Sequence, residues 1–291
     1  MSEVYPVVAQ LVNDGFEIKQ VCEWLSVSRS GYYQFQRDDS CNRKQEDERL
    51  MPLIKEAFFA HRRRYGARRI SLELKARGET CGREKTRKIM DEMGLAAIQP
   101  RSFKPRTTDS RHKLGYNDNL LMNSAPPTHI NQVWVGDITY IPLIKGWAYL
   151  ALLMDLYSRR IVGWAIDSHM QEALVLRALR HAMTARQPQA GLIHHTDRGG
   201  QYAATNYRAA LQRSKIEQSM SRADNCYDNA FMESCFGTIK TELELKPYPS
   251  LEEASREIQE YVNYYNTLRR HSGIEYHSPL EFERRRRSRP R

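Results

Sequence analysis

Long apolar runs are missing from this sequence. No stretch of about 18 hydrophobic residues occurs in its 291 positions, so no membrane-spanning helix is expected. The opening MSEVYPVVAQLVNDG contains acidic residues and has no basic leader, which argues against a secretory signal peptide. We therefore expect a cytoplasmic protein without a membrane partner.

Closely paired cysteines are missing as well. The five cysteines form no CxxC motif, and together with the nine histidines they lack the spacing of a zinc finger. An odd number of cysteines in a protein that is not expected to be secreted indicates reduced thiols. The cysteines are Cys22, Cys41, Cys81, Cys226 and Cys235.

The chain also has no excess of acidic residues. Lys and Arg outnumber Asp and Glu by 45 to 35, which gives a formal net charge of +10 and a pI near 9.4. This balance favours a polyanionic partner, and nucleic acid is favoured over a membrane because no apolar anchor is present. The length suits about two domains, and the 41% hydrophobic content is enough for real cores.

Residues 1–40 are expected to form a small helical unit of helix-turn-helix type. Helices are predicted through residues 7–13 and 18–25, and Ser28 is placed to cap a third helix. Arg29 would then face DNA. The alternative is an ordinary three-helix bundle whose neighbouring tyrosines, Tyr32 and Tyr33, belong to its core.

A second helical DNA-binding unit is expected over residues 48–98, after a charged linking stretch over residues 36–51. Its helices are predicted over residues 53–60, 67–77 and 83–93. The turn between the first two is strongly cationic and is expected to bind DNA phosphates, although a solvated surface is the usual role of such a run. Its arginines are Arg62, Arg63, Arg64, Arg68 and Arg69.

The rest of the chain is expected to be an α/β core. Residues 99–127 have scattered prolines and no periodicity, which indicates a basic linker. Residues 128–285 would form the core, and residues 286–291 a basic tail, with the composition of residues 281–291 favouring disorder. In the core, β-rich runs over residues 132–143, 147–156 and 160–167 predict an antiparallel meander. Helices and strands then alternate: helix 171–186, strand 192–195, helix 205–214, strand 216–220 and helix 228–243. A capping box at Ser250 begins a last helix, which runs to about residue 269. This order predicts a mixed sheet with helices on its faces.

Three acidic residues stand out within this pattern. Asp137 lies in the first strand, on the face of Val133 and Val135, with Trp134 on the opposite face. Asp197 follows a short buried strand, and Glu233 lies near the start of the helix over residues 228–243, whose apolar stripe is Phe231, Phe236, Ile239 and Leu243. Any one of these acids alone could be a structural carboxylate. Together, on three separate elements, they indicate a divalent-metal site for phosphodiester chemistry, because Mg²⁺ prefers carboxylate oxygens and leaves room for phosphate.

Five ordered motifs carry a family resemblance: NQVWVGDITYIP, LLMDLYSRRIVGW, HHTDRGGQY, SMSRADNCYDNAFMESCFGTIKTE and YVNYYNTLRRHSGIEYHSPLEF. At these motifs the chain resembles the transposases of bacterial insertion sequences that have a retroviral-integrase-type core. The resemblance is to the second-reading-frame (OrfB) product of the copy-out, paste-in group. The upstream RRRYGARRI and the helices after it are similar to the helix-turn-helix segment of these proteins.

The resemblance implies an RNase H-like, mixed five-stranded sheet flanked by helices and preceded by helix-turn-helix units. Asp137, Asp197 and Glu233 match the family's catalytic acid triad, which implies two Mg²⁺ (or Mn²⁺) ions per active site. Lys240 matches a basic residue placed seven after the glutamate and is expected to point at the DNA terminus; a merely solvated lysine is the alternative. The implied partners are transposon-end DNA, target DNA, further copies of the chain on DNA, and a first-reading-frame (OrfA) product or a fusion with it. The implied location is the bacterial nucleoid.

Some residues depart from the family's pattern or have competing roles. Gly136 and Thr196 stand where Thr and Ser are commoner, and Asp224 adds negative charge near the site. His194 and His195 could act as general bases, but the metal chemistry does not require one. Asp155, Asp228 and Asn229 also lie in matching motifs and are expected to be structural turn and cap groups.

The function expected from these observations is a DNA transposase. It would cleave one strand at each transposon end in a metal-dependent reaction and then use the freed 3′-hydroxyl to attack another phosphodiester. One alternative is an RNase H-like nuclease or resolvase that only hydrolyses, and another is a non-catalytic DNA-binding regulator that uses residues 1–100. Tyrosine or serine recombinase chemistry is disfavoured because no HxxR motif with a later tyrosine is evident.

Overall fold

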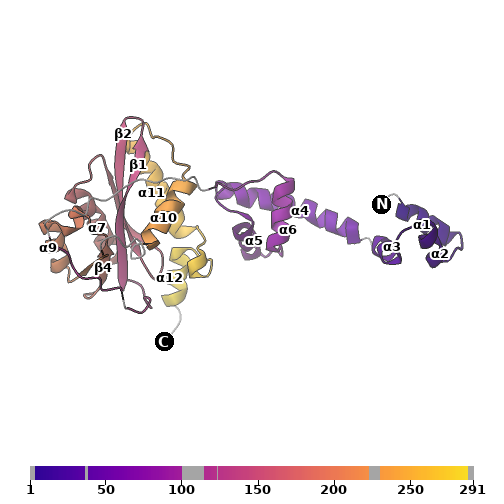
Figure 1. The fold of residues 1–291 in the computed structure, drawn as a ribbon, viewed down its shortest axis with the longest axis horizontal. Helices are drawn as coiled ribbons and strands as arrows, with labels where there is room; N and C mark the ends of the chain where they lie inside the picture. The colour runs from indigo at the N-terminus through magenta and orange to yellow at the C-terminus, as the bar shows by residue number, and fades with distance from the viewer. Residues whose placement is uncertain (1–3, 37–38, 100–114, 123, 223–229, 288–291) are drawn as a thin grey trace. The chain divides into compact units, whose positions relative to one another are not determined.

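The structure, a computed structural model, describes residues 4–36, 39–99, 115–122, 124–222 and 230–287, and for residues 39–42 it describes the backbone alone. The chain divides into two units, Met1–Ala97 and Ile98–Arg291. Each unit is described here by itself (Figure 1). No helix among the described residues is long and apolar enough to cross a membrane.

The first three helices pack around a small core of their own. They are α1 (Val4–Asn13), α2 (Ile18–Trp24) and α3 (Arg29–Gln36). Ser28 caps α3, because its Oγ accepts a hydrogen bond from the Gly31 N–H at 3.0 Å, as the sequence predicts. Tyr32 is buried in this core, whereas Tyr33 is 48% exposed, so the two neighbouring tyrosines have different environments.

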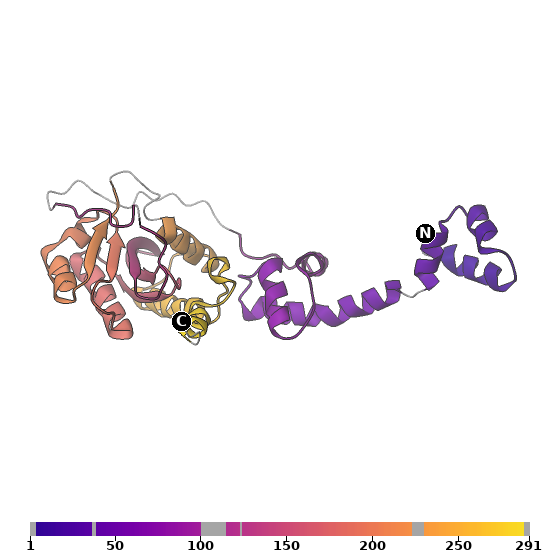
Figure 2. The ribbon, with the colours of Figure 1, turned by 90° about the horizontal axis from the view of Figure 1, so that it is seen from below.

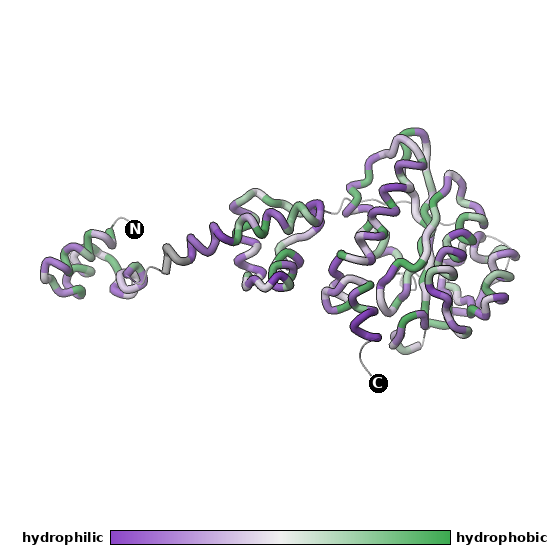
Figure 3. Tube along the Cα trace, turned by 180° about the vertical axis from the view of Figure 1, so that it is seen from behind, coloured by the Kyte–Doolittle hydropathy of each residue, from purple (hydrophilic) through white to green (hydrophobic). Residues whose placement is uncertain are grey.

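The charged stretch over residues 36–51 was predicted to be a linking segment, and this prediction is wrong for residues 39–51. They form the first half of α4 (Asp39–Ala60), and Figure 3 shows its coloured part, from residue 43 on, to be largely hydrophilic. Two physical reasons favour the helix. The segment is rich in Arg, Lys, Gln and Glu, which are good helix formers. Its side chains also pair with later elements: Arg49 Nη2 is 2.8 Å from Glu79 Oε2, and Lys85 Nζ is 3.0 Å from Asp47 Oδ1.

The second half of α4 packs with two further helices, α5 (Ala67–Ala76) and α6 (Arg83–Glu92). Their buried contact residues include Leu50, Ile54, Phe58, Ile70, Leu74 and Ile89. The sequence predicts α5 and α6 within one residue of their ends. Gly94, at φ 65°, follows α6 in the left-handed conformation that glycine adopts most easily.

The second unit is organised around one mixed sheet in the order β3-β2-β1-β4-β5. Its strands are β1 (Val133–Leu143), β2 (Gly146–Asp155), β3 (Ile161–Asp167), β4 (Ile193–Thr196) and β5 (Glu217–Met220). The first three pair antiparallel, whereas β1 with β4 and β4 with β5 pair parallel. The predicted meander and the predicted mixed sheet are both confirmed.

Helices cover both faces of this sheet (Figures 1 and 2). One face packs against α7 (Glu172–Arg186), α8 (Gly200–Ala203) and α9 (Thr205–Arg213). The other face packs against α10 (Ala230–Glu242) and α11 (Leu251–Thr267). Ser250 caps α11 by accepting from the Glu253 N–H at 3.2 Å, as the capping box predicts.

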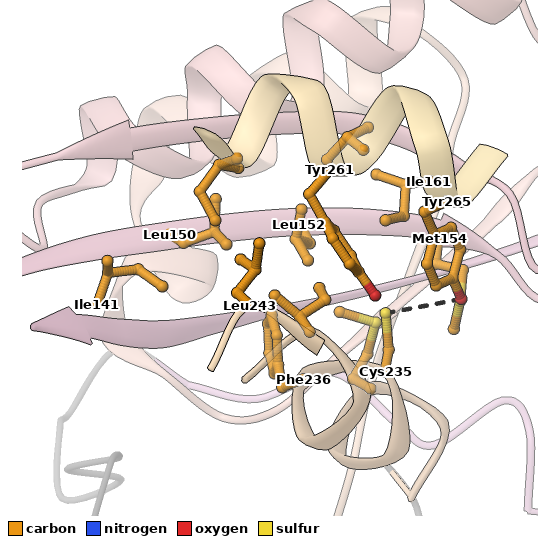
Figure 4. Packing of buried hydrophobic residues seen from close by; sticks show 14 of the residues in the cluster. Ile141, Leu150, Leu152, Met154, Ile161, Cys235, Phe236, Leu243, Tyr261 and Tyr265 are labelled. Atoms are coloured by element: carbon orange, nitrogen blue, oxygen red, sulfur yellow. Dashed lines mark hydrogen bonds between the residues drawn. The ribbon is translucent and has the colours of Figure 1, made fainter. Parts of the chain in front are cut away.

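The α10 face of the sheet has a continuous apolar core (Figure 4). Side chains of β1 and β2 such as Ile141, Leu150 and Leu152 meet Phe236 of α10, Leu243 directly after it, and Tyr261 of α11. The predicted stripe of α10 is wrong at Phe231, which is 44% exposed and lies beneath the Arg159 guanidinium at 4.2 Å. Met232 and Cys235 fill the core instead. This packing fixes α10 against the strand that contains Asp137.

The C-terminal region corrects another prediction. Residues 281–287 are not irregular, because α12 (Pro279–Arg287) follows the short 3-10 turn Ser272–Ile274. Glu283 anchors this helix: it is 2% exposed and accepts from the Arg160 and Arg186 guanidiniums, each at 2.8 Å. Composition alone does not predict this helix, because Arg186 and Arg160 lie 97 and 123 positions away from Glu283 in the sequence.

Several sequence expectations fall outside the described residues. These are the roles of Asp224, Asp228 and Asn229, the state of Cys226 and of the Cys41 side chain, and the final residues of the tail. Cys22, Cys81 and Cys235 are free and buried. Asp155 is structural, as expected: its carboxylate accepts from the N–H groups of Asn131, Tyr157 and Ser158 at 2.6–3.1 Å.

Candidate active site

Asp137 lies on β1, and Asp197 directly follows the neighbouring parallel strand β4 at the same level. In the β1–β4 register Gly136 pairs with Thr196, so each aspartate is the next residue of its chain. Period-two alternation places Asp137 on the face of Val133 and Val135, which belong to the α10 core, while Trp134 belongs to the core on the other face. The predicted face of Asp137 is thus confirmed.

The loop after β4 holds the Asp197 carboxylate. Its Oδ1 accepts a hydrogen bond from the Gly199 N–H at 2.9 Å. A Cβ at position 199 would lie 3.0 Å from the same oxygen, so glycine gives the carboxylate the room it needs. On β1, Asp137 Oδ1 accepts from the Ile138 N–H at 2.7 Å. Both carboxylates are therefore oriented by backbone donors.

Glu233 and Lys240 are presented by α10. Glu233 lies in its first turn and is exposed, while Lys240 lies in its last turn and is half-buried. Seven positions at about 100° each return to nearly the same side of a helix, about 10 Å farther along. The buried residues Met232, Phe236 and Ile239 attach the adjacent side of α10 to the sheet. The two charged side chains therefore flank the same edge of the helix.

The electrostatics of Asp137 link these residues to one another. Burial raises the pKa of Asp137 well above its usual value, and the nearby charges of Asp197 and Glu233 raise it further. The positive charge of Lys240 lowers the pKa of Asp137. Burial lowers the pKa of Lys240 itself, and Asp137 partly offsets that effect. Asp197, Glu233 and Lys240 thus all lie within electrostatic range of Asp137.

The donor set suits a hard divalent cation. Among the residues that the structure describes, no three His, Cys, Asp or Glu side chains already form a cluster that could hold a metal ion. Asp197 and Glu233 nevertheless raise the energy of the ionised form of Asp137, which a cation with oxygen ligands would relieve. These residues fit Mg²⁺ or Mn²⁺ by chemistry and by the face they share.

The two histidines before Asp197 are part of the interior. Both are fully buried, and His194 Nε2 is 2.8 Å from the Tyr207 hydroxyl, while His195 Nδ1 is 2.8 Å from Ser219 Oγ. Burial lowers the pKa of His194 to about 4, so its ring is neutral near pH 7. A Cβ at Gly136 would lie 2.8 Å from His194 Cε1, which explains a glycine in the middle of β1. These positions favour a supporting role over a general base.

The cationic turn after α4 presents some of its arginines and buries one. Arg62, Arg63 and Arg68 are exposed, and Arg69 is partly exposed, with its guanidinium 5.5 Å from the Tyr65 ring centroid. Arg64 is only 8% exposed, so it belongs to the interior of the unit and adds little to a DNA-facing surface. Arg29, at the start of α3, is exposed.

The sequence analysis did not single out Arg198, which follows Asp197 directly. Its Nε donates to the Ser221 carbonyl oxygen at 2.8 Å, and its guanidinium lies 4.6 Å from the ring centroid of Tyr116. Residues 115–122, which were expected to belong to the linker, pack along β5: the Leu120 N–H donates to Ser219 Oγ at 2.9 Å. No local pattern marks this arrangement, because Arg198 lies far in sequence from its partners Tyr116 and Ser221.

Three protein-family models match the chain. Two describe an integrase core domain and match residues 127–226 and 214–279. The third describes an HTH-like domain and matches residues 45–103. The first integrase match spans β1 to β5 and includes Asp137 and Asp197, and the second includes Glu233.

Solved structures with a similar arrangement include two retroviral proteins. The HTLV-2 integrase catalytic core domain in complex with magnesium has a TM-score of 0.43 at 18% identity, covering 53% of this chain and 96% of that one. A chain of the simian T-cell lymphotropic virus intasome in complex with the PP2A regulatory subunit B56 gamma has a TM-score of 0.47 at 14% identity, covering 82% of this chain and 75% of that one.

Curated relatives match nearly the whole chain. The insertion element IS600 31 kDa protein of Shigella sonnei is 43% identical over 90% of this chain and 97% of its own length. The transposase for IS904 of Lactococcus lactis is 41% identical over 83% and 96%, and the transposase InsF for IS3A of Escherichia coli is 36% identical over 92% and 94%. This chain therefore belongs to the insertion-sequence transposases that combine an HTH-like domain with an integrase core, and it is a polynucleotidyl transferase of DNA transposition.

Proposed function

We propose that Asp137, Asp197 and Glu233 are the catalytic acids of one site that cuts a strand at the transposon end and then joins the freed 3′-hydroxyl to a new phosphodiester. The supporting observation is their placement. Two aspartates follow paired residues on adjacent parallel strands, and the helix with the glutamate packs on the same face. Because the same attack geometry serves water and a 3′-hydroxyl, one site suffices for both steps.

Each residue has a distinct part in this proposal. Two Mg²⁺ or Mn²⁺ ions, when bound by the three carboxylates, would supply Lewis-acid stabilisation of the attacking and leaving oxygens. The N–H groups of Ile138 and Gly199 keep the two aspartates oriented before DNA arrives. Lys240, half-buried along the same side of α10 as Glu233, holds a phosphate of the DNA terminus in register.

The DNA-binding surface in the proposal lies on the first unit. Arg62, Arg63, Arg68 and Arg69 would contact backbone phosphates, and Arg29 would do the same from α3. Such contacts set affinity and position without reading sequence. Assembly of several copies on the two DNA ends, and cooperation with a first-reading-frame product, belong to the same proposal.

A strand-joining assay tests this function. End-labelled DNA that contains the element's terminal sequence is incubated with the protein and Mg²⁺ or Mn²⁺, with and without the first-frame product. We expect labelled strands longer than the substrate, because a freed 3′-hydroxyl is joined to a second strand. Shortened strands alone would identify a nuclease. DNA binding without any strand breakage under all conditions would favour the regulator.

A further inference from the structure

One tyrosine close to the acids has an unusual hydroxyl group. Tyr202, on the short helix α8, is 1% exposed. Among the residues that the structure describes, its Oη makes no hydrogen bond. Buried hydroxyl groups nearly always have a partner, because leaving one unsatisfied is unfavourable for folding. A native chain that keeps such a group invites a functional explanation.

A neighbouring tyrosine provides the contrast. Tyr207 is equally buried and packs edge-on against Tyr202, with ring centroids 5.5 Å apart. Its hydroxyl, however, is 2.8 Å from His194 Nε2 and is thus satisfied. The His194 ring also lies edge-on to Tyr202, with centroids 6.4 Å apart. The two tyrosines share one apolar surrounding, and packing alone would be served equally well by phenylalanine at position 202.

The backbone fixes Tyr202 next to Asp197. Its N–H donates to the Gly199 carbonyl oxygen at 3.0 Å, and its own carbonyl oxygen accepts from Gln218 Nε2 at 2.7 Å. Gly199 lies between the acid and the ring: a Cβ built there is 3.0 Å from Asp197 Oδ1 and 3.6 Å from Tyr202 Cδ2. The ring therefore stands directly behind the loop that orients the carboxylate.

The carboxylates of the proposed site act electrostatically on the phenol of Tyr202. Burial raises the pKa of Tyr202 well above its usual value, and Asp137 and Asp197 are among the neighbours that raise it further. The phenol thus stays protonated over the whole working pH range and can act only as a neutral donor toward these acids. Ionised carboxylates are strong acceptors for such an O–H group.

We propose that Tyr202 is a positioning residue whose hydroxyl donates a hydrogen bond to the Asp197 carboxylate when DNA and cations gather the acids for the reaction. The proposal rests on the function proposed above. Groups that orient metal-binding carboxylates from behind typically change activity or metal affinity by about 10–100-fold when they are removed. The hydroxyl would limit the rotation of the acids without touching the DNA.

Two conservative variants separate this role from a structural one. Tyr202→Phe removes the unsatisfied hydroxyl and is expected to keep or raise the thermal midpoint, yet to slow strand joining about 10-fold or more and to raise the Mn²⁺ concentration for half-maximal rate. Tyr207→Phe removes a satisfied hydroxyl and is expected to lower the thermal midpoint while the joining rate, measured well below that midpoint, stays within about twofold of the wild type. Tyr202→Phe should therefore lose activity without losing stability, and Tyr207→Phe should lose stability without losing activity.

Different outcomes would contradict the positioning role of Tyr202 and the proposed acid site. If wild-type protein joins strands and Tyr202→Phe joins them at the same rate with the same Mn²⁺ dependence, the positioning role is wrong. A parallel loss of thermal midpoint and rate in Tyr202→Phe would also overturn it, since that result describes a packing residue. If strand joining persists in Asp137→Asn, the proposed acid site itself fails, whatever the tyrosine variants do.

Discussion

Asparagine in place of Asp137 is expected to abolish strand joining while making the metal-free protein more stable. The activity loss should be about 10³-fold or more, because several kcal/mol of transition-state stabilisation depend on the charged oxygens that hold the cations, and each 1.36 kcal/mol is about tenfold in rate. Joined product from labelled end DNA measures the first effect. Thermal unfolding in a chelating buffer measures the second.

The stability gain follows from the sign of the pKa shift. Burial, Asp197 and Glu233 raise the pKa of Asp137 in the folded chain, so folding favours its protonated form. Above the folded-state pKa the ionised group therefore destabilises the fold, and below the unfolded value of about 3.9 this penalty is absent. The amide of the Asp137→Asn variant carries no charge at any pH. The variant should exceed the wild type in stability near neutral pH and match it at a pH below the unfolded value.

A matched control uses an exposed acid outside the site. Asp14 lies beyond the end of α1 and is exposed, so Asp14→Asn should leave both joining and thermal midpoint near the wild-type values. Wild-type joining by Asp137→Asn would remove this residue from the catalytic site. A lower midpoint of Asp137→Asn near neutral pH would contradict the electrostatic description of the carboxylates.

The second large effect concerns a buried ion pair at the end of α10. Arg269 Nη2 is 2.7 Å from Glu242 Oε1, and both side chains are 6% exposed. The Tyr261 hydroxyl also donates to Glu242, at 3.0 Å. Burial lowers the pKa of Arg269, but the hydrogen bonds and charge of Glu242 outweigh that effect and leave it raised. This pair fixes the end of the helix that also presents Glu233.

Arg269→Met should lower the free energy of unfolding by about 3–5 kcal/mol, because it leaves the Glu242 carboxylate buried without its charged partner. Urea unfolding followed by circular dichroism provides the measurement. The double variant Arg269→Met/Glu242→Leu is the control, and it should recover most of the loss, since apolar replacements of a buried pair are often neutral. A single-variant loss below about 1 kcal/mol would mean that the pair behaves as an exposed one.

Local patterns in the sequence were enough to predict the sheet and the placement of the acids. Alternation along VWVGDITYIPL put Asp137 on its correct face, and the strand before Asp197 and the periodic helix around Glu233 supplied the other two positions. These features depend on residues within one element. The parallel pairing of β1 with β4 brings Asp137 and Asp197 to the same level, within the mixed sheet that the order of elements predicts.

Features that depend on distant partners were missed. The first half of α4 is helical although it has no apolar stripe that would mark it, and α12 is ordered by a glutamate buried against Arg160 and Arg186. The helix that contains Tyr202 has four residues, which is too short for a periodic signal. The environment of the Tyr202 hydroxyl becomes visible only when the surrounding rings are placed.

The most direct test is anomalous diffraction from crystals of the protein bound to its end DNA and Mn²⁺. We expect manganese peaks between β1, β4 and α10, with oxygens of Asp137, Asp197 and Glu233 at ligand distance, about 2.1 Å for the Mg²⁺ that Mn²⁺ replaces. Manganese bound elsewhere, or bound without Glu233 while the DNA end occupies the site, would contradict the convergence of the three acids.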